Sequence, residues 1–424
     1  LRTMELSDVN LLEDTWWGQV PHEMFDLLRA EAPVYWHAEP PEQGPGFWAV
    51  TRWEDIRAIS KDTATFSSEH LGTFIKDPDP EALAQIRLSI LNMDPPKHHR
   101  YRRLVNRGFT PRVIRTLEQT IDERARMIVD QLTSDSDIDF VADVAVQMPA
   151  QVICDMLGVP PEDQQMVVDW TNTMVGFDDP YWQNTAEDGM NAAVAMFGYC
   201  FELAQQRRAE PRDDIASVLV EAEVDGERLT DEELVMFFVT LAVAGNETTR
   251  NLITHSVMAL DRFPEVAAEL RADPSLWPSA VEEMLRWGSS IHNFRRTAMV
   301  DTRIGDVDIA AGDKVVIYYM AGNFDPAVFA DPHTFDIRRS PNEHQTFGGG
   351  GEHYCLGANL AKVEIRAMLR EFVDRVDSFT ITGEPIRMRS DFINGINKLP
   401  MHIGTVAPAP LASTSASTSA WGGA

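Results

Sequence analysis

The sequence predicts a mainly α-helical protein with a minor β part, and three observations favour that fold class. Apolar residues recur at helical spacing more often than they alternate along the chain. One pattern without proline continues from Thr230 to Phe263. No internal repeat or linker interrupts the chain before Pro400. We therefore expect one continuous unit over residues 1–404, although a chain of 424 residues commonly holds two or three domains.

Local signals predict the elements in order along the chain. Residues 47–60 predict a short strand and then a helix that begins near Trp53. Residues 95–107 open with two prolines, which the first turn of a helix tolerates, and predict a helix. Residues 298–320 contain short β-like runs separated by glycines and predict a small sheet. Residues 405–424 carry no charge and consist mainly of Ala, Ser, Thr and Gly, which predicts a disordered low-complexity tail.

The strongest single element is the long helix. Thr230 and Glu233 form an S/T-x-x-E capping box at its start, and the pattern ends before Pro264. About thirty residues at 1.5 Å each predict a helix of roughly 45–50 Å. Residues 234–245 in its middle are apolar on every side, so we expect this part to be buried throughout.

Charge and cysteine content exclude several classes of protein. The chain has 37 basic and 66 acidic side chains, a net charge of −29, which argues against nucleic acid or an anionic membrane as the main partner. The longest apolar run, residues 234–245, is shorter than the ~20 residues that span a bilayer. Three cysteines without a CxxC pair argue against a disulfide framework or a zinc site. We therefore expect a soluble protein of the reducing cytoplasm.

The segment FGGGGEHYCLG at residues 347–357 is the most informative motif. A glycine-rich turn leads into Cys355, and an amphipathic helical pattern follows it. A cysteine just before a helix N-terminus is favoured as a thiolate, and glycines let the backbone approach a flat ligand closely. A thiolate held in this way suits a metal such as haem iron. The alternative is a small buried hydrophobe, which is how we interpret Cys154 and Cys200.

Three weaker constellations accompany this motif. Residues 244–249, AGNETT, place an acid and hydroxyls in the middle of the long apolar helix, where a proton path or a mere packing notch would explain them. Glu283 and Arg286 stand at i, i+3 spacing on one helix face, as many surface ion pairs do. His98 and Arg102 stand at i, i+4 spacing and could clamp an anion, unless they form an ordinary solvated face.

Taken together and in this order, the segments resemble those of the cytochrome P450 family of haem-thiolate monooxygenases, over about residues 20–403. The resemblance implies a single triangular fold with a long central helix crossing the haem. It implies haem b as the cofactor, with Cys355 as the proximal ligand of the iron. It also implies that Glu247 and Thr248 are the acid–alcohol pair for dioxygen activation.

The resemblance assigns further residues by position. Glu283 and Arg286 form a structural pair that Arg339 closes. Arg295 is an alternative to Arg296, because the two are adjacent and the register is open. The residues expected to bind the haem or its propionates are His98, Arg102, Ala244, Arg296, Phe347, Gly348, His353 and Gly357.

One departure from the common family loop points to a subgroup. Phe347 lies eight residues before Cys355 instead of seven, so the loop has one extra glycine and Gly348 takes the usual place of the phenylalanine. This form, with AGNETTRN in the long helix and SDFINGI at residues 390–396, resembles bacterial enzymes that hydroxylate steroid side chains and branched lipids.

The expected substrate pocket lies on the haem face opposite Cys355 and is mostly apolar, which suits a steroid, a terpenoid or a branched lipid. The same side chains could instead form ordinary core. The residues expected to line it are Val243, Ala244 and Thr248 of the long helix, Ile291 and Phe294, Phe392 and Ile393, and a lid of Phe74, Ile75, Leu88 and Leu91.

The resemblance also implies partners. The haem domain and the tail use nearly the whole chain, so electrons must come from separate proteins, which we expect to be a ferredoxin and its reductase. Six basic residues could form a docking face for these partners, or they could be solubilising charges scattered over the surface. They are Arg100, Arg103, Arg107, Arg112, Lys362 and Arg366. Two alternatives to a monooxygenase are a haem-binding carrier or gas sensor, which leaves the acid–alcohol pair unexplained, and a peroxide-driven peroxygenase, whose known examples generally lack that pair.

Overall fold

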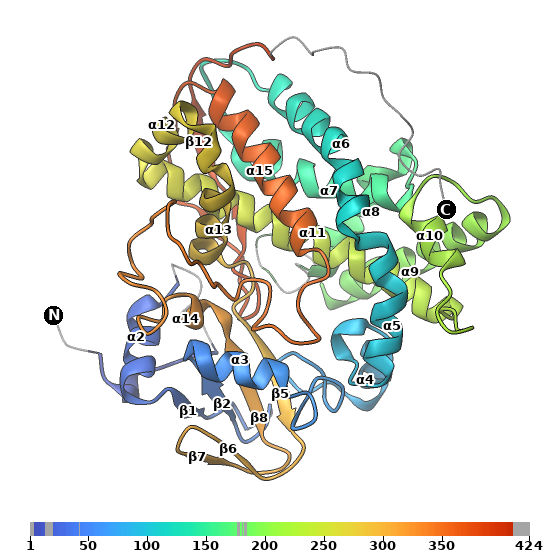
Figure 1. The fold of residues 1–424 in the computed structure, drawn as a ribbon, viewed down its shortest axis with the longest axis vertical. Coiled ribbons are helices and arrows are strands. Elements are labelled where there is room, and N and C mark those ends of the chain that lie inside the picture. Colours follow the sequence, from blue (N-terminus) through green and yellow to red (C-terminus); the bar gives the residue numbers. More distant parts are fainter. Residues whose placement is uncertain are drawn as a thin grey trace. The chain divides into compact units, whose positions relative to one another are not determined.

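The computed structural model describes residues 4–12, 20–41, 43–175, 179, 181 and 185–409 (Figure 1). The chain forms two compact units, each assembled from separated stretches. Unit 1 comprises Leu1–Arg102, Leu285–Cys355 and Arg389–Asn394, and unit 2 comprises Arg103–Met284, Leu356–Met388 and Gly395–Ala424. Cys355 therefore belongs to unit 1, and the long helix belongs to unit 2.

A five-stranded sheet organises unit 1, with the strand order β1-β2-β8-β5-β3. Its strands are β1 (Val34–His37), β2 (Phe47–Val50), β3 (Phe66–Ser67), β5 (Asn293–Ala298) and β8 (Lys314–Tyr318). β2 and β8 pair in parallel, and the other neighbours pair antiparallel. Along β8, Val316 and Tyr318 pack into one apolar cluster while Val315 and Ile317 pack into another, as the two-residue period of a strand requires. The sheet thus has a core on both faces.

Short helices and one hairpin complete unit 1. The strand and helix predicted over residues 47–60 are confirmed by β2 and α3, and the β-like runs of residues 298–320 are confirmed by β5 to β8. The predicted helix over residues 95–107 is α5, followed by a 3₁₀ turn at Asn106–Phe109, and α5 continues into unit 2. The elements are α2 (His22–Glu31), α3 (Trp53–Lys61), α4 (Pro80–Ile86), α5 (Lys97–Val105), α14 (Tyr319–Asn323), β6 (Thr302–Ile304) and β7 (Val307–Ile309), with 3₁₀ turns at Leu6–Asp8 and Ile90–Asn92.

Unit 2 is mainly helical and is built around α11 (Asp231–Arg262). The helix contacts α7, α8, α9 and α15. The other helices are α6 (Pro111–Asp130), α7 (Gln147–Leu157), α8 (Pro161–Val175), α9 (Ala186–Ala209), α10 (Ile215–Glu221), α12 (Pro264–Ala272), α13 (Trp277–Gly288), which continues into unit 1, and α15 (Ala358–Arg375). The strands are β4 (Ser136–Asp139), β9 (Phe379–Ile381) and β12 (Pro400–Ile403) in one sheet, and β10 (Ile386–Arg387) and β11 (Ile396–Lys398) in another. A π-helical turn spans Val141–Ala145, and a 3₁₀ turn spans Pro274–Leu276.

The long helix begins and ends close to the predicted residues. Thr230 is its N-cap, and the capping box with Glu233 is formed in both directions. The 32 residues of α11 correspond to about 48 Å of helix. We expected residues 234–245 to be buried throughout, and this prediction was wrong because Ala244 is exposed. The neighbouring helices pack on the other faces of α11 and leave this small residue accessible.

Three further findings concern the predicted tail, the membrane and the cysteines. At the start of the predicted tail, the Asp377 N–H donates to the Thr405 carbonyl and the Ala407 N–H donates to the Arg375 carbonyl, whereas residues 410–424 lie outside the described residues. Among the described helices, none is long and apolar enough to cross a bilayer. None of the three cysteines forms a disulfide bond; Cys154 and Cys200 are buried and Cys355 is exposed.

Candidate functional site

The loop that carries Cys355 folds back on itself through backbone hydrogen bonds. The Cys355 N–H donates to the Phe347 carbonyl at 2.9 Å, and the Gly348 N–H donates to the Gln345 carbonyl at 2.8 Å. Gly357 is the N-cap of α15, which begins three residues after the cysteine, as predicted. The thiol is thus exposed at the positive end of a helix dipole.

The glycines of this loop serve packing as well as turning. Gly348, Gly350 and Gly351 have φ values of +102°, +88° and +76°, which other residues rarely adopt. A Cβ at Gly351 would lie 2.5 Å from the carbonyl oxygen of Ser60 on α3. A Cβ at Gly357, in contrast, would meet nothing within 4 Å. The sequence predicted glycines for the approach of a ligand, and the structure shows that Gly351 lies against α3.

Four predicted cofactor-binding residues of unit 1 form a cluster beside the loop. We call His98, Arg102, Arg296 and His353 the cationic cluster, after its two arginines. The Arg102 Nη2 donates to the Tyr354 carbonyl at 2.8 Å, and the Arg102 guanidinium interacts electrostatically with Cys355. The rings of His98 and His353 lie 4.4 Å apart between centroids. Both ring nitrogens of His98 and the Nε2 of His353 are buried without a hydrogen-bond partner. The cluster therefore holds donors that an anionic ligand could satisfy.

Burial and mutual repulsion keep the two imidazoles of this cluster neutral. Desolvation, assisted by the nearby Arg102, lowers the pKa of His98 to about 4. Desolvation also holds the pKa of His353 well below its ordinary value, and Arg296 adds to the shift. The closest carboxylate, Glu352, makes its shorter contact with His99, at 2.6 Å, and lies 3.9 Å from the Nδ1 of His98. An anionic ligand at these rings would raise both pKa values and could accept hydrogen bonds from the unpartnered ring nitrogens.

The structure separates Arg296 from Arg295, which the sequence left open. Adjacent residues of β5 point to opposite faces of the sheet. Arg295 binds Asp77, with 2.5 Å between Nη1 and Oδ1. Arg296 hydrogen-bonds Tyr319 and acts electrostatically on His353. Arg296 is therefore the arginine of the cationic cluster.

In unit 2, the predicted acid–alcohol pair lies in the middle of α11. Burial raises the pKa of Glu247, and Arg250 opposes this shift. The Arg250 Nη2 lies 2.7 Å from the Glu247 Oε2, and both side chains are at most 2% exposed. The side-chain amide of Asn251 donates to the Glu247 carbonyl at 2.9 Å. Arg250 was not among the predicted residues, although its i, i+3 spacing from Glu247 is the same signal that pairs Glu283 with Arg286.

The helix is not opened at Gly245. The Thr248 hydroxyl donates to the Ala244 carbonyl at 2.6 Å, and α11 continues without a break. A Cβ at Gly245 would lie 2.6 Å from the Cδ1 of Ile153 on α7. This glycine is therefore the packing notch that the sequence offered as an alternative, while the hydroxyl of Thr248 stays accessible at the helix surface.

The predicted structural residues are partly brought together. Arg286 and Arg339 both donate to the carbonyl of Thr334, at 3.2 and 3.0 Å. Arg286 also donates to the carbonyls of Asn323 and Pro332, at 2.9 Å each. Glu283 is fully buried on α13, one turn before Arg286. The two arginines thus fix the backbone that leads to the Cys355 loop.

Most predicted substrate residues of unit 1 meet in one cluster. The ring of Phe392 lies 4.8 Å from that of Phe74 and 5.2 Å from that of Phe294. Ile291 and Ile393 pair through a β-bridge. Phe74 is 43% exposed. We call Phe74, Ile291, Phe294, Phe392 and Ile393 the aromatic cluster.

Other lid residues lie elsewhere. Ile75 is buried in the core cluster of unit 1, so its assignment to the lid was wrong. Leu91 is half-buried in a 3₁₀ turn, and Leu88 is half-buried before it. Val243 and Ala244 remain on α11, where Val243 is half-buried.

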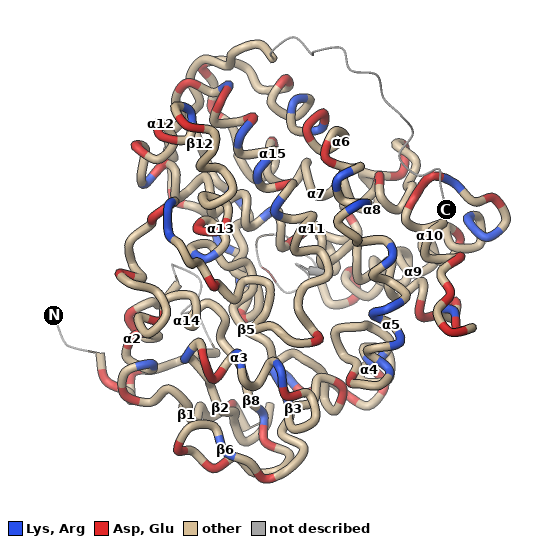
Figure 2. Tube along the Cα trace, viewed as in Figure 1, with Lys and Arg blue, Asp and Glu red and all other residues tan. Residues whose placement is uncertain are grey.

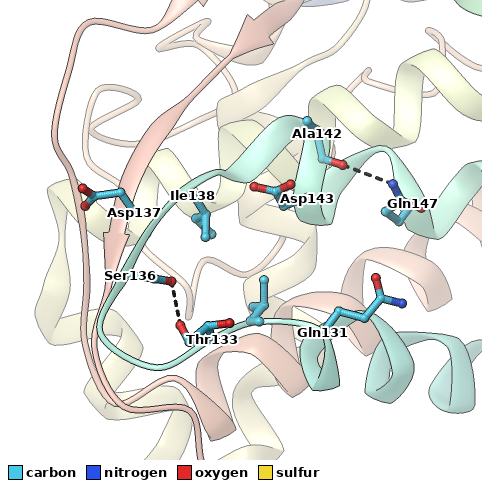
Figure 3. A pocket seen from close by; sticks show the side chains of 9 residues that line it. Gln131, Thr133, Ser136, Asp137, Ile138, Ala142, Asp143 and Gln147 are labelled. Carbon is cyan, nitrogen blue, oxygen red and sulfur yellow. Dashed lines mark hydrogen bonds between the residues drawn. The ribbon is translucent and has the colours of Figure 1, made fainter.

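A cavity of about 490 Å³ in unit 2 is a separate feature (Figure 3). Its lining residues lie between Gln131 and Gln147, and they include Thr133, Ser136 and Asp143. They supply no thiol, imidazole or cation, and none of them is a predicted site residue. We do not assign the chemistry to this cavity.

Basic residues lie along α5, in the first part of the chain, and along α15, which directly follows the cysteine loop (Figure 2). Several of them are already paired with acids. Arg103 lies 2.7 Å from Asp225, and Lys362 lies 2.7 Å from Glu282. A basic docking face would thus be partly neutralised.

Comparison with known proteins identifies the family. A family model described as cytochrome P450 matches residues 47–398. A methyl-branched lipid omega-hydroxylase of Mycobacterium tuberculosis is 42% identical over 410 residues, which cover 93% of this chain and 95% of that protein. A steroid C26-monooxygenase of Rhodococcus jostii is 39% identical over 402 residues, covering 93% of this chain and 84% of that protein.

Solved structures agree with this match. The structure of a Mycobacterium marinum cytochrome P450, CYP268A2, in complex with pseudoionone superposes with a TM-score of 0.86. The two sequences are 38% identical, and the alignment covers 95% of this chain and 99% of that chain.

Proposed function

The chain belongs to the cytochrome P450 family and is a haem-thiolate monooxygenase, and we propose that it hydroxylates the end of a methyl-branched apolar chain. Membership of this family confirms the activity and the cofactor that the motifs predicted. The proposed substrate rests on the aromatic cluster of unit 1 and on similarity to relatives that are named for branched lipids and for a steroid.

The cationic cluster fits the cofactor. Haem carries two anionic propionates, and the partnerless nitrogens of His98 and His353 lie beside Arg102 and Arg296. We propose that these four side chains hold the propionates and that Cys355 is the iron ligand. Phe347, Gly348 and Gly357 shape the backbone around that thiolate, and Ala244 offers a small accessible surface on α11.

The residues of α11 manage protons in this proposal. When bound, the haem supplies dioxygen activation and inserts one oxygen atom into the substrate. The Thr248 hydroxyl, already directed along the helix to the Ala244 carbonyl, donates a proton where the dioxygen binds. The Glu247 carboxylate would take up a proton from water and pass it to Thr248 in exchange, and Arg250, whose Nη2 lies 2.7 Å from the Glu247 Oε2, orients that carboxylate.

The substrate surface is apolar and aromatic. Phe392 contacts both Phe74 and Phe294 edge to face, and this apolar surface suits a branched aliphatic chain better than a charged ligand. Binding energy from such a surface comes mainly from buried area, and branching increases the area presented near the end of the chain.

Electrons come from redox partner proteins, as in the family generally, and we propose a ferredoxin and its reductase for this chain. The exposed arginines of α5 and α15 would attract a small, acidic electron-carrier protein. The free, buried thiols of Cys154 and Cys200 support residence in a reducing cytoplasm.

A spectral titration tests the substrate. We expect the haem spin-state shift of the holoenzyme to saturate at lower concentrations of a fatty acid with a terminal isopropyl group than of its straight-chain isomer. With a surrogate ferredoxin and reductase, the product is expected to carry the hydroxyl on a terminal methyl group. Equal affinity for the two isomers, or oxidation inside the chain, contradicts the proposed substrate.

Two matched variants test whether the aromatic cluster binds the substrate. Phe74→Ala is expected to weaken binding by up to about 13-fold, because it removes apolar surface whose burial against the substrate contributes up to about 1.5 kcal/mol. Met299 is also 43% exposed in unit 1 and lies outside the cluster, so Met299→Ala is the control and is expected to leave affinity unchanged. Cys355→Ala, by contrast, is expected to abolish the thiolate signature in the carbon monoxide difference spectrum.

A further inference from the structure

Helix α9 carries an apolar stripe that is exposed among the described residues of unit 2. Met190, Val194 and Phe201 are 63%, 64% and 44% exposed, and Phe197 between them is half-buried. Their spacing of four, three and four residues places all four on one face of the helix. Exposed apolar side chains scattered singly are ordinary, but a continuous stripe at this spacing is typical of a helix–helix seam.

The opposite face of α9 already supplies the internal packing. Ala192, Met196, Cys200 and Leu203 are buried, and α9 contacts α8, α10 and α11. The stripe is therefore additional to what the unit needs for its own core.

Charged residues lie at the two ends of the apolar stripe on α9. Glu187 lies in the first turn of α9, one turn before Met190, and Arg208 lies in the last turn, seven residues after Phe201. At 100° per residue, both fall within about 60° of Met190 around the helix axis. The helix dipole favours an acid at the start and a base at the end, but it does not account for the apolar residues between them.

We propose that α9 is an antiparallel, two-fold docking face for a second copy of this chain. A two-fold axis between Phe197 and Gly198 places Glu187 beside Arg208 of the partner subunit at both ends. The same axis places Val194 beside Phe201 of the partner subunit. A Cβ at Gly198 would meet nothing within 4 Å, so the partner subunit's Phe197 has room to pack there.

The charge pattern along α9 is complementary to itself and therefore favours a second copy of this chain as the binding partner. A two-fold interface presents the same patch twice, so an acid at one end and a base at the other become opposed pairs only when the helices run antiparallel. The net charge of −29 disfavours an anionic membrane as the occupant. A single pair of helices buries less than the roughly 1,200–2,000 Å² of a standard stable interface, so the dimer is weak and depends on concentration.

Sedimentation velocity of the holoenzyme over a concentration series tests the docking face. The wild type is expected to show a monomer–dimer equilibrium, and Phe201→Glu is expected to weaken it at least roughly tenfold, since it buries a charge in the seam. Met127→Glu is the control, because Met127 on α6 is 51% exposed and lies off the stripe. A thermal melt and the carbon monoxide difference spectrum, unchanged in Phe201→Glu, show that the variant still folds and holds haem.

A charge-mixing experiment tests the orientation. Glu187→Arg and Arg208→Glu each place like charges at both ends of the homodimer and are expected to weaken it. An equimolar mixture of the two variants restores opposite charges at both ends, so the heterodimer is expected to re-form. Arg208 also pairs with Asp231 within its own chain, and the mixture controls for the loss of that pair.

Three results overturn the proposal. One is a wild type that stays monomeric at every concentration. Another is a dimer that neither Phe201→Glu nor the charge variants weaken, since the interface then lies elsewhere. The third is binding of the wild-type monomer to phosphatidylcholine vesicles that Phe201→Glu abolishes, which would assign the stripe to a lipid surface.

Discussion

Two buried charged groups of this protein differ in where their counter-charge comes from. On α11, Glu247 and Arg250 neutralise each other one helical turn apart, at 2.7 Å. Beside the cysteine loop, His98 and His353 lie with two arginines and have ring nitrogens without partners. The first group is complete within the chain, and the second would be completed by the propionates that we propose for it.

In the proposed function, the first group is preorganised for proton transfer and the second for binding the cofactor. A buried pair keeps its charge without outside help, and it can hold a proton-transfer group in one orientation. A buried cationic cluster instead stores an unfavourable electrostatic energy, which an anion releases when it binds. Breaking either group should therefore have different consequences.

The largest effect is expected from removing Arg250. Arg250→Met leaves the buried carboxylate of Glu247 without its counter-charge, and loss of one partner of a buried pair costs about 3–5 kcal/mol. The pKa of Glu247, already raised by burial, rises further because Arg250 opposed that shift. The native state then loses stability as pH rises through this raised pKa. Urea unfolding at several pH values is expected to show a deficit at neutral pH that shrinks in acid, and a deficit independent of pH would contradict the pairing.

The adjacent arginines of β5 offer a direct contrast. Arg296→Leu is expected to weaken haem retention by about 1.5–3 kcal/mol, the usual contribution of a hydrogen bond to a charged group. Arg295→Leu removes the contact with Asp77 and is expected to lower the unfolding temperature with little change in haem retention. Haem transfer to apomyoglobin measures retention. The assignment of Arg296 is wrong if Arg295→Leu loses haem faster.

The pH dependence of the apoprotein sharpens the same contrast. The pKa of His98 falls from 6.5 to about 4 on folding. Its neutral form is thus favoured in the native state, so its contribution to stability is complete above pH 6.5 and is lost as pH falls towards 4. His98→Gln is expected to reduce the slope of unfolding free energy against pH in this window by up to about 1.4 kcal/mol per pH unit. An unchanged slope would mean that His98 titrates normally.

The smallest effect is expected at the glycines. Gly351→Ala places a methyl group 2.5 Å from the Ser60 carbonyl at a φ of +76°, and the left-handed conformation alone costs roughly 1–2 kcal/mol. Gly357→Ala meets open space and is expected to change the unfolding temperature little. Equal melting temperatures for the two variants would show that the loop does not press on α3.

Local signals in the sequence were sufficient for elements whose causes are local. The capping box of Thr230 and Glu233 predicts the start of α11 because both partners lie within one turn. The position of Cys355 before a helix follows equally from adjacent residues. The roles assigned to Cys355, Glu247 and Thr248 stay predictions, although the family and its cofactor are confirmed.

Features that depend on distant residues were not predictable. The pairing of β2 with β8 joins segments more than 250 residues apart, and no periodicity specifies it. The choice between Arg295 and Arg296 depends on the register of β5 against β8. Ile75 entered the core instead of the lid because it packs with β-strand residues that precede and follow it at long range.

The contact of the cysteine loop with α3 has an entropic consequence. Gln345 is held by the side chain of Asn323 and by the carbonyl of Trp53, and Gly351 packs against Ser60. Fixing the backbone of a flexible residue costs about 1–2 kcal/mol of conformational entropy. Here folding of unit 1 restricts these residues before any cofactor arrives. Haem capture therefore requires little ordering of the loop, and most of its favourable free energy remains available as affinity.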